Sequence, residues 1–364
     1  MNILHLIHGR VATGPAAAAI TDAECLIAAG HKVWLASGAD SKLAQSCAAK
    51  SIPNVAGLKL GKGARRLLNA PHDMRKLREI LRELAIDVLH IHRSDDQLLA
   101  GLSLGKTLST IMVRSWHRNP GTIPRILLKK LASHTEGCIC VAREHAATLT
   151  ETGARAEFIH GAVDTSIFKP GSDVAQRVPP RIGHVGRWKR DRSGVDRGQR
   201  AVLEIFSKIP PVLAWQGLLI GRGEMADNLR RAISDELRLP RDRVMLLDTE
   251  KKSLPEFVTS LASLRLGLVL APGSDGTSRA ALEMLACGVP LLLSNLPGLR
   301  EIGEDESCAS VQLPADANGW AAKIIELLRD PARLNAMSAA ARVRAEKYHS
   351  LKTRGEALAE FYRK

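Results

Sequence analysis

Aromatic side chains are scarce in this chain, at 3% of its 364 residues. Proteins that bind single-stranded nucleic acid stack the bases on aromatic rings, and no DNA- or RNA-binding motif is visible either. The composition therefore argues against a nucleic-acid partner. Long apolar runs are also missing, because none reaches the roughly 18 residues of a membrane-spanning helix. No signal peptide precedes the first strand-like run, Ile3–Ile7, so we expect a cytoplasmic protein.

The six cysteines are scattered along the chain, without the spacing of a zinc site or of a disulfide framework. The closest two, Cys138 and Cys140, are separated by one residue in an apolar, strand-like run. We therefore expect buried thiols in a reducing compartment.

Acidic residues are too few to balance the basic ones. The chain has 38 Asp and Glu against 52 Lys and Arg, which gives a formal net charge of +14. Such a charge attracts an anionic partner, for example a phosphorylated substrate or an anionic membrane surface. Hydrophobic residues at 45% and charged residues at 25% are typical of a globular chain, and the length suffices for two domains.

Strand-like apolar runs alternate with helical patterns along the whole chain. This order predicts the α/β class, with parallel sheets covered by helices on both faces. In the first half, Ile3–Ile7 and Lys32–Ala36 flank an Ala-rich helix near residues 16–29. The polar stretch 171–180 reads as a linker. In the second half we expect strands at Ile182–Val185, Gly217–Ile220, Val244–Leu247, Leu266–Leu270 and Leu291–Ser294.

Residues 272–301 contain two acidic residues at a distinctive spacing. Asp275 lies in a glycine-containing loop, and Glu283 follows eight positions later in a helical run. Backbone N–H groups at a helix start bind phosphates, and a carboxylate accepts two hydrogen bonds from hydroxyls. The pattern suits a sugar joined to a diphosphate. An ordinary capped helix, with Asp275 or Ser278 as the cap, is the alternative interpretation.

This stretch resembles the acidic-x7-acidic signature of the retaining nucleotide-sugar glycosyltransferases of family 4, which have the GT-B fold. The segment 158–170 is similar to the element that ends the first domain in that family. The resemblance covers nearly the whole chain. It implies two Rossmann-like, doubly wound parallel-sheet domains facing a central cleft. The first would span residues 1–168 and bind the acceptor, with a C-terminal helix at 345–364 crossing back onto it. The second would span residues 178–344 and bind the nucleotide sugar.

The same resemblance implies roles for individual residues. Two arginines would neutralise the diphosphate leaving group, because arginine forms bidentate hydrogen bonds to phosphate oxygens. They are Arg187, in the family's Gly-Arg turn, and Arg197, at the position of a family lysine. Lys189 is an alternative for the second role. His117 would approach the donor sugar. The implied catalytic residues are His117, Arg187, Arg197 and Asp275. The implied donor-binding residues are Gly14, Arg187, Lys189, Arg197, Gly221, Leu247, Asp275, Gly276, Thr277, Ser278 and Glu283.

We expect no cofactor and no tightly bound metal. The pair Asp95-Asp96 lacks a third ligand nearby and reads as a cap on a helix at Gln97–Leu104. His90 and His92 lie in a strand-like run and read as satisfied core histidines.

The predicted function is the retaining transfer of a sugar from a nucleotide-diphosphate donor to a hydroxyl on a glycan or glycolipid acceptor. Synthesis of a cell-envelope glycan such as lipopolysaccharide fits this class. The cationic, amphipathic stretches 61–84 and 123–132 predict peripheral contact with an anionic membrane at its inner face. Two other functions stay open: a GT-B nucleotide-sugar epimerase, and a degenerate protein that binds the sugar nucleotide without catalysis.

Overall fold

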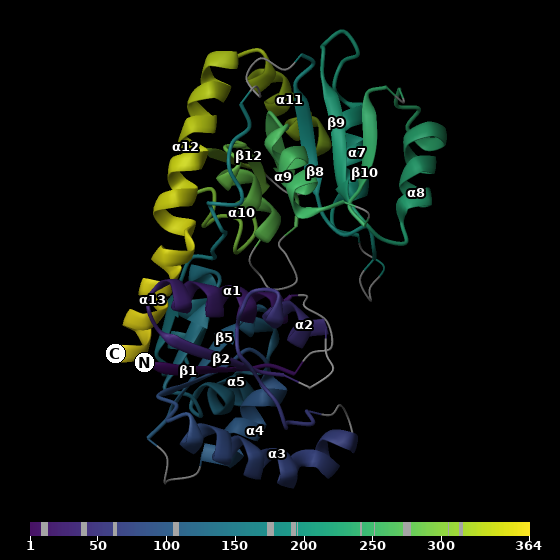
Figure 1. The fold of residues 1–364 in the computed structure, drawn as a ribbon. Coiled ribbons are helices and arrows are strands. Elements are labelled where there is room, and N and C mark those ends of the chain that lie inside the picture. Colours follow the sequence, from purple (N-terminus) through teal and green to yellow (C-terminus); the bar gives the residue numbers. More distant parts are fainter. Residues whose placement is uncertain are drawn as a thin grey trace. The chain divides into compact units, whose positions relative to one another are not determined.

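The computed structural model describes the chain except residues 9–13, 38–41, 61–63, 105–108, 173–177, 191–193, 195, 241, 251, 272–277, 305 and 313–315. The described chain forms two compact units (Figure 1). The first unit contains Met1–Ala162 and Leu351–Lys364, and the second contains Val163–Gly273 and Ser278–Ser350. Residues 163–168 and 345–350, which the sequence prediction assigned to the first domain, thus group with the second unit.

The first unit is built on a seven-stranded parallel sheet in the order β3-β2-β1-β4-β5-β6-β7. Its strands are β1 Asn2–Leu6, β2 Lys32–Ala36, β3 Asn54–Val55, β4 Val88–Ile91, β5 Ile111–Trp116, β6 Gly137–Cys140 and β7 Ala156–Phe158. The strand order reverses direction between β1 and β4. In doubly wound sheets, ligands bind outside the carboxyl ends of the strands at such a reversal.

Helices cover this sheet, and the last helix of the chain packs against the first. They are α1 Pro15–Ala28, α2 Lys42–Ala48, α3 Ala64–Glu83, α4 Ser94–Leu104, α5 Arg125–Ala132, α6 Arg143–Thr150 and α13 Leu351–Arg363. The α1–α13 packing is close because α13 presents Gly355 to the α1 backbone. A Cβ on Gly355 would lie 2.0 Å from the carbonyl oxygen of Cys25.

We expect Gly355→Ala to destabilise the protein by about 1–3 kcal/mol, because the new methyl group forces two packed helix backbones apart. Gly101→Ala in α4 is the matched control, since a Cβ there meets nothing within 4 Å. Alanine favours a helix interior over glycine by about 1 kcal/mol, so this control should be neutral or stabilising. Urea unfolding of both variants measures the difference. Equal stability of the two would contradict the close helix contact.

The second unit contains a six-stranded parallel sheet in the order β10-β9-β8-β11-β12-β13. Its strands are β8 Arg181–Val185, β9 Gln216–Gly221, β10 Val244–Asp248, β11 Leu266–Val269, β12 Leu291–Ser294 and β13 Ala309–Gln312. Its helices are α7 Gln199–Ser207, α8 Ala226–Arg231, α9 Leu254–Ala262, α10 Arg279–Ala286, α11 Ala317–Leu328 and α12 Pro331–His349. Two apolar cores form here, one including Trp188, Phe206 and Trp320, the other including Met284 and Leu293.

The predicted alternation of strands and helices is confirmed in both units, and all sheet pairings between the named strands are parallel. Three short strands, β3, β7 and β13, were not predicted. The C-terminal helix expected at 345–364 is divided between the end of α12 and α13. Over the described residues, no helix is both long enough and apolar enough to span a bilayer.

Candidate functional site

Two glycine-containing turns pack against each other at the carboxyl ends of β8 and β9. The amide of Trp188 donates to the carbonyl of Arg222 at 2.9 Å, and the amide of Met225 donates to the carbonyl of Trp188 at 3.0 Å. A Cβ on Gly221 would lie 2.0 Å from the carbonyl oxygen of Gly186. Only glycine permits this approach, which fixes both turns at the edge where a doubly wound sheet binds its ligand.

The start of α7 is tied to the same turn. Gly198 adopts a left-handed conformation with φ of 92°, and its amide donates to the Asp196 carboxylate at 2.7 Å. The fully buried Gln199 donates from Nε2 to the carbonyl of Arg187 at 3.1 Å and accepts from the amide of Arg197 at 2.9 Å. Gln199 therefore holds the backbones of Arg187 and Arg197 in a fixed relation.

Four arginines from separate segments form what we call the arginine cluster: Arg187, Arg197, Arg222 and Arg279. Partial burial lowers the pKa of Arg187 below its usual value, and the positive charges of the other three lower it further. Like charges that converge in this way repel one another unless an anion joins them. The cluster is therefore suited to bind a group with several negative charges, such as a diphosphate.

Arg279 begins α10, the helix that carries the second predicted acidic residue. Glu283 is half-buried and follows Arg279 by four positions, so both lie on one face of the helix. Ser278 occupies the N-cap position and is buried, but its side chain makes no capping hydrogen bond. The loop residues Asp275, Gly276 and Thr277 lie outside the described part of the chain.

The structure brings only some of the predicted donor residues together. Arg187 and Arg197 meet in the arginine cluster. Lys189 is exposed on the same turn and is not among the charges that shift the pKa of Arg187. Leu247 lies in β10, at the edge of the sheet two strands from β8. Sequence reasoning missed Arg279 and the charge of Arg222, although the Gly-Arg-Gly order around Arg222 could have indicated it.

In the first unit, His8, which follows β1, is held by residues that follow the neighbouring strand β4. Gly14 precedes α1 with φ of 55°, and Pro15 occupies the first helical turn. The Asp96 carboxylate accepts from the amide of His8 at 2.9 Å, while Arg93 donates to the His8 carbonyl at 2.7 Å. Helix α4 starts at Ser94 and so includes Asp96 in its first turn. Neither aspartate therefore occupies the predicted cap position before the helix, and Asp96 instead accepts from the amide of His8, which follows β1.

His117, the predicted donor-sugar residue, directly follows β5 and is 7% exposed. It belongs to a group of four histidines on one face of the sheet. We call this group, His5, His90, His92 and His117, the histidine stack. Nδ1 of His5 lies 2.9 Å from Nε2 of His92, and Nδ1 of His92 lies 3.2 Å from Nε2 of His117. His90 bonds instead to the hydroxyls of Ser115 and Tyr362, at 2.8 and 2.7 Å.

Burial governs the protonation of this stack. It lowers the pKa of His5 to about 4, against a raising effect of Asp22, and it holds the pKa values of His90 and His92 well below their usual value. These three rings are therefore neutral near pH 7. A period-2 pattern at the ends of three neighbouring strands, with His5, His90-x-His92 and Ser115-x-His117, is the sequence signal that would have indicated the stack.

His5, His90 and His92 each offer one ring nitrogen within 4.8 Å of the others, which is a spacing compatible with a metal ion. Both nitrogens of His90 and both of His92 are already hydrogen-bonded, however. The rings of His90 and His92 also stack with centroids 4.4 Å apart, so their in-plane lone pairs run side by side instead of converging. The donor set fits a hydrogen-bonded network better than a metal centre.

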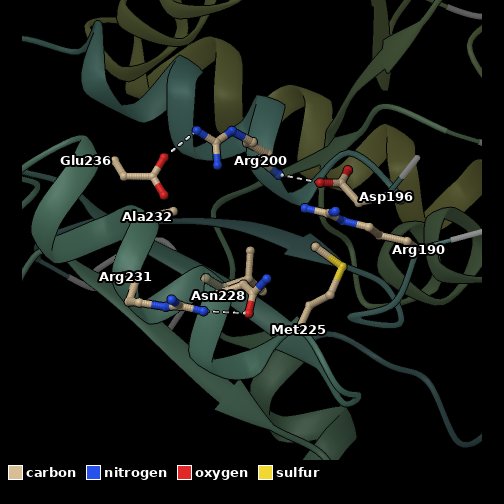
Figure 2. A pocket seen from close by; sticks show the side chains of 9 residues that line it. Arg190, Asp196, Arg200, Met225, Asn228, Arg231, Ala232 and Glu236 are labelled. Carbon is tan, nitrogen blue, oxygen red and sulfur yellow. Dashed lines mark hydrogen bonds and ion pairs between the residues drawn. The ribbon is translucent and has the colours of Figure 1, made fainter. Parts of the chain in front are cut away.

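A pocket of about 240 Å³ lies in the second unit, next to the turn that carries Arg187 (Figure 2). It is lined by Arg190, Asp196, Arg200, Met225, Asn228, Leu229, Arg231, Ala232 and Glu236. Both carboxylates of the pocket already have partners within the protein. Glu236 pairs with Arg200, and Asp196 accepts from backbone amides at the start of α7. The pocket includes no member of the arginine cluster and is smaller than the roughly 300–1,000 Å³ of typical ligand sites.

Solved structures with the same two-sheet architecture define the fold class as GT-B. A glycosyltransferase from Rickettsia africae superposes with a TM-score of 0.81 at 16% identity, over 100% of this chain and 97% of that one. Anabaena HepE in complex with UDP and glucose gives a TM-score of 0.77 at 16% identity, over 99% of both chains.

Two family models then identify the chain. Residues 14–167 match the model described as Glycosyltransferase Family 4, and residues 179–330 match the model described as Glycosyl transferases group 1. The chain belongs to the family 4 type of GT-B glycosyltransferases.

Among curated proteins, the chain is similar to a GDP-mannose-dependent alpha-(1-6)-phosphatidylinositol monomannoside mannosyltransferase from Mycolicibacterium smegmatis. The two are 26% identical over 255 residues, which is 65% of each chain. A D-inositol 3-phosphate glycosyltransferase from Mycobacterium avium is 28% identical over 220 residues, or 58% of this chain and 50% of the relative. The similarity thus spans one half to two thirds of the length of these relatives.

Proposed function

We propose that this protein transfers a sugar, with retention of anomeric configuration, from a nucleotide-diphosphate donor to a hydroxyl acceptor. The observation that carries the proposal is the arginine cluster, which gathers four cations at the carboxyl ends of β8 and β9 and at the start of α10. Both the phosphate-binding chemistry and the family membership support a donor bound through its diphosphate.

The proposed chemistry follows from the charge that develops when the glycosidic bond breaks. Negative charge grows on the departing diphosphate, and pre-positioned guanidinium groups stabilise it more in the transition state than in the ground state. Gln199 supports this role because it fixes the backbones of both Arg187 and Arg197 through short hydrogen bonds. Retention would be checked by the anomeric configuration of the isolated product.

We expect Arg187→Ala to lower kcat for glycosyl transfer roughly 100-fold, the usual cost of removing one group that stabilises developing negative charge. Arg190→Ala is the matched control, because Arg190 belongs to the same turn but is not among the charges that act on Arg187. Steady-state kinetics with the cognate donor measures both. An Arg187→Ala enzyme as active as Arg190→Ala would contradict the assignment.

The base and the sugar of the donor differ among the similar proteins, which include a GDP-mannose-dependent enzyme and a structure with UDP and glucose. A thermal-shift panel of UDP, GDP, ADP and their sugars separates these donors. A ligand at one hundred times its dissociation constant stabilises the native state by about 2.7 kcal/mol. Free epimerised sugar nucleotide formed without acceptor would favour an epimerase, and binding without any turnover would favour a degenerate protein.

We further propose a membrane-linked or phosphorylated acceptor, as in envelope glycan synthesis. Exposed apolar and basic side chains occur together on α5 of the first unit, where Ile126 is 89% exposed beside Lys129 and Lys130. Leu67 and Leu68 on α3 are exposed as well. Basic residues gain about 1 kcal/mol each near an anionic membrane surface, so such a helix supports peripheral binding.

We expect the protein to sediment with anionic lipid vesicles and Ile126→Glu to weaken this binding strongly, because the substitution adds a negative charge where an apolar side chain would insert. The matched control is Val212→Glu, at a comparably exposed aliphatic residue of the second unit. Binding should also fall steeply with salt, since the Debye length shrinks from about 10 Å at 0.1 M to about 3 Å at 1 M. Equal binding by the two variants would refute the role of α5.

A further inference from the structure

The histidine stack contains a continuous hydrogen-bonded path that ends at His117. We call the path from His5 through His92 to His117 the histidine chain. Its two links are the 2.9 Å and 3.2 Å contacts between ring nitrogens, and its three members are 0%, 3% and 7% exposed. His90 touches the chain by ring stacking but takes no part in it, because both of its nitrogens bond to hydroxyls.

A chain of neutral imidazoles has a direction. A neutral ring has one N–H donor and one lone-pair acceptor, so a ring that donates at one nitrogen must accept at the other. In the histidine chain, both hydrogen bonds must therefore point the same way. Either every ring donates toward His117, or every ring donates toward His5. The choice made at the His5 end fixes the tautomer of His117 two rings away.

The His5 end lies near a buried carboxylate. Nε2 of His5 has no hydrogen-bond partner, and neither has Oδ2 of Asp22, although both atoms are buried. The other carboxylate oxygen of Asp22 accepts from Nε of Arg354 at 2.7 Å, so the two side chains form a buried ion pair. Asp22 is close enough to raise the pKa of His5. An ionised carboxylate accepts hydrogen bonds and cannot donate them, so it favours hydrogen on Nε2, the ring nitrogen of His5 that is not engaged with His92.

We propose that Asp22 and His5, acting through His92, hold His117 in the tautomer with hydrogen on Nε2 and a lone pair on Nδ1. His5 then accepts at Nδ1 from Nε2–H of His92, and His92 accepts at Nδ1 from Nε2–H of His117. In this tautomer Nδ1 of His117 is a hydrogen-bond acceptor, which is the chemistry that a substrate hydroxyl requires. This second step rests on the proposed function, in which His117 approaches the donor sugar. His5, His92 and Asp22 are positioning residues, since they act through His117.

The first test observes the tautomers directly. In protein labelled with ¹⁵N at histidine, two-bond ¹⁵N–¹H correlations distinguish protonated from unprotonated ring nitrogens, and His117→Gln assigns the His117 signals. We expect Nε2 of His117 to be protonated and Nδ1 to be unprotonated near pH 7, with the same tautomer in His5 and His92. Hydrogen on Nδ1 of His117 would overturn the proposal. This result does not depend on whether the protein transfers sugars.

The second test compares two phenylalanine variants of the stack. His92→Phe and His90→Phe each keep a buried ring and each remove two hydrogen bonds, so we expect similar losses of stability. Only His92→Phe breaks the histidine chain. It should abolish the single tautomer of His117 and lower kcat about 10- to 100-fold with little change in donor KM. His90→Phe should leave both properties near wild type.

The possible outcomes distinguish the proposed role of the histidine chain from a purely structural role and from a metal site. Equal kinetic effects of the two phenylalanine variants would reduce the stack to a structural role and overturn the proposal. Stoichiometric Zn²⁺ binding that shifts the ring signals of His5, His90 and His92 would reassign the cluster as a metal site and also overturn it. A protein with no transferase activity but the expected tautomers would contradict the proposed function alone.

Discussion

Lowering the pH from 8 to 5 is expected to reduce the free energy of unfolding of the first unit, by about 2 kcal/mol from His5 alone. His5, His90 and His92 are buried as neutral rings, and their pKa values in the folded state lie well below the usual value of 6.5. At pH 5 the unfolded chain protonates all three, while the folded unit does not. Protonating His5 in the unfolded chain then costs the fold about 2 kcal/mol, since one pKa unit corresponds to about 1.4 kcal/mol, and His90 and His92 act in the same direction.

The sign of this effect follows from proton binding. Between the two pKa values of each ring the unfolded state holds more protons than the folded state, so stability decreases as the pH falls. The loss begins near pH 6.5 and, for His5, ends near pH 4, where the folded state also takes up the proton. Since domains are typically stable by only about 5–15 kcal/mol, this loss is a sizeable share of the stability of the first unit.

Hydrogen-exchange mass spectrometry, corrected for the intrinsic exchange rate at each pH, follows the two units separately. The second unit should lose less, because it contains two histidines, His184 and His349, against ten in the first unit. His90→Phe removes one titrating ring from the first unit and should shrink its loss. A first unit whose stability does not change between pH 8 and pH 5 would show that these rings are already charged in the fold.

Much of the fold could be predicted because both sheets are buried on both faces. Strands such as β4 and β12 are mostly apolar and buried at every residue, and parallel order follows from the helices between them. The strands that were missed have a different character. β3 contains two residues and β7 contains three half-buried ones, so neither produces an apolar run that local patterns can detect.

The candidate site was only partly predictable, because its groups come from distant segments. Arg187 and Arg197 were expected from their motif positions. Arg279 was not, since nothing in its neighbourhood indicates that its charge acts on Arg187. The histidine chain was missed for a related reason. His92 read as an isolated core residue until the pairing of β1 with β4 and of β4 with β5 aligned it between His5 and His117.

We expect Arg354→Met to destabilise the first unit by about 3–5 kcal/mol, the usual cost of removing one partner from a buried ion pair. Arg354 is 5% exposed and Asp22 is 1% exposed, so the substitution leaves an unpaired carboxylate in the interior. It also removes the donor to the carbonyls of Ile159 and His160. Both carbonyls lie just before the chain leaves the first unit, so Arg354 joins α13, α1 and this exit segment.

Lys352→Met is the matched control, because Lys352 lies on the same helix and pairs with Glu356 at an exposed position. Exposed pairs contribute little, so this variant should unfold like wild type in urea. The double variant Arg354→Met/Asp22→Leu should recover part of the lost stability, since it removes the buried charge that the single change leaves behind.

The Arg354→Met variant also tests whether Asp22 is charged, as the proposal for the histidine chain requires. If Asp22 is ionised, losing Arg354 must be costly, and the cost must fall when Asp22 is removed as well. An Arg354→Met protein as stable as wild type would mean that Asp22 is a neutral acid. A neutral acid can donate to His5 as readily as accept from it, and Asp22 would then no longer set the direction of the hydrogen bonds that reach His117.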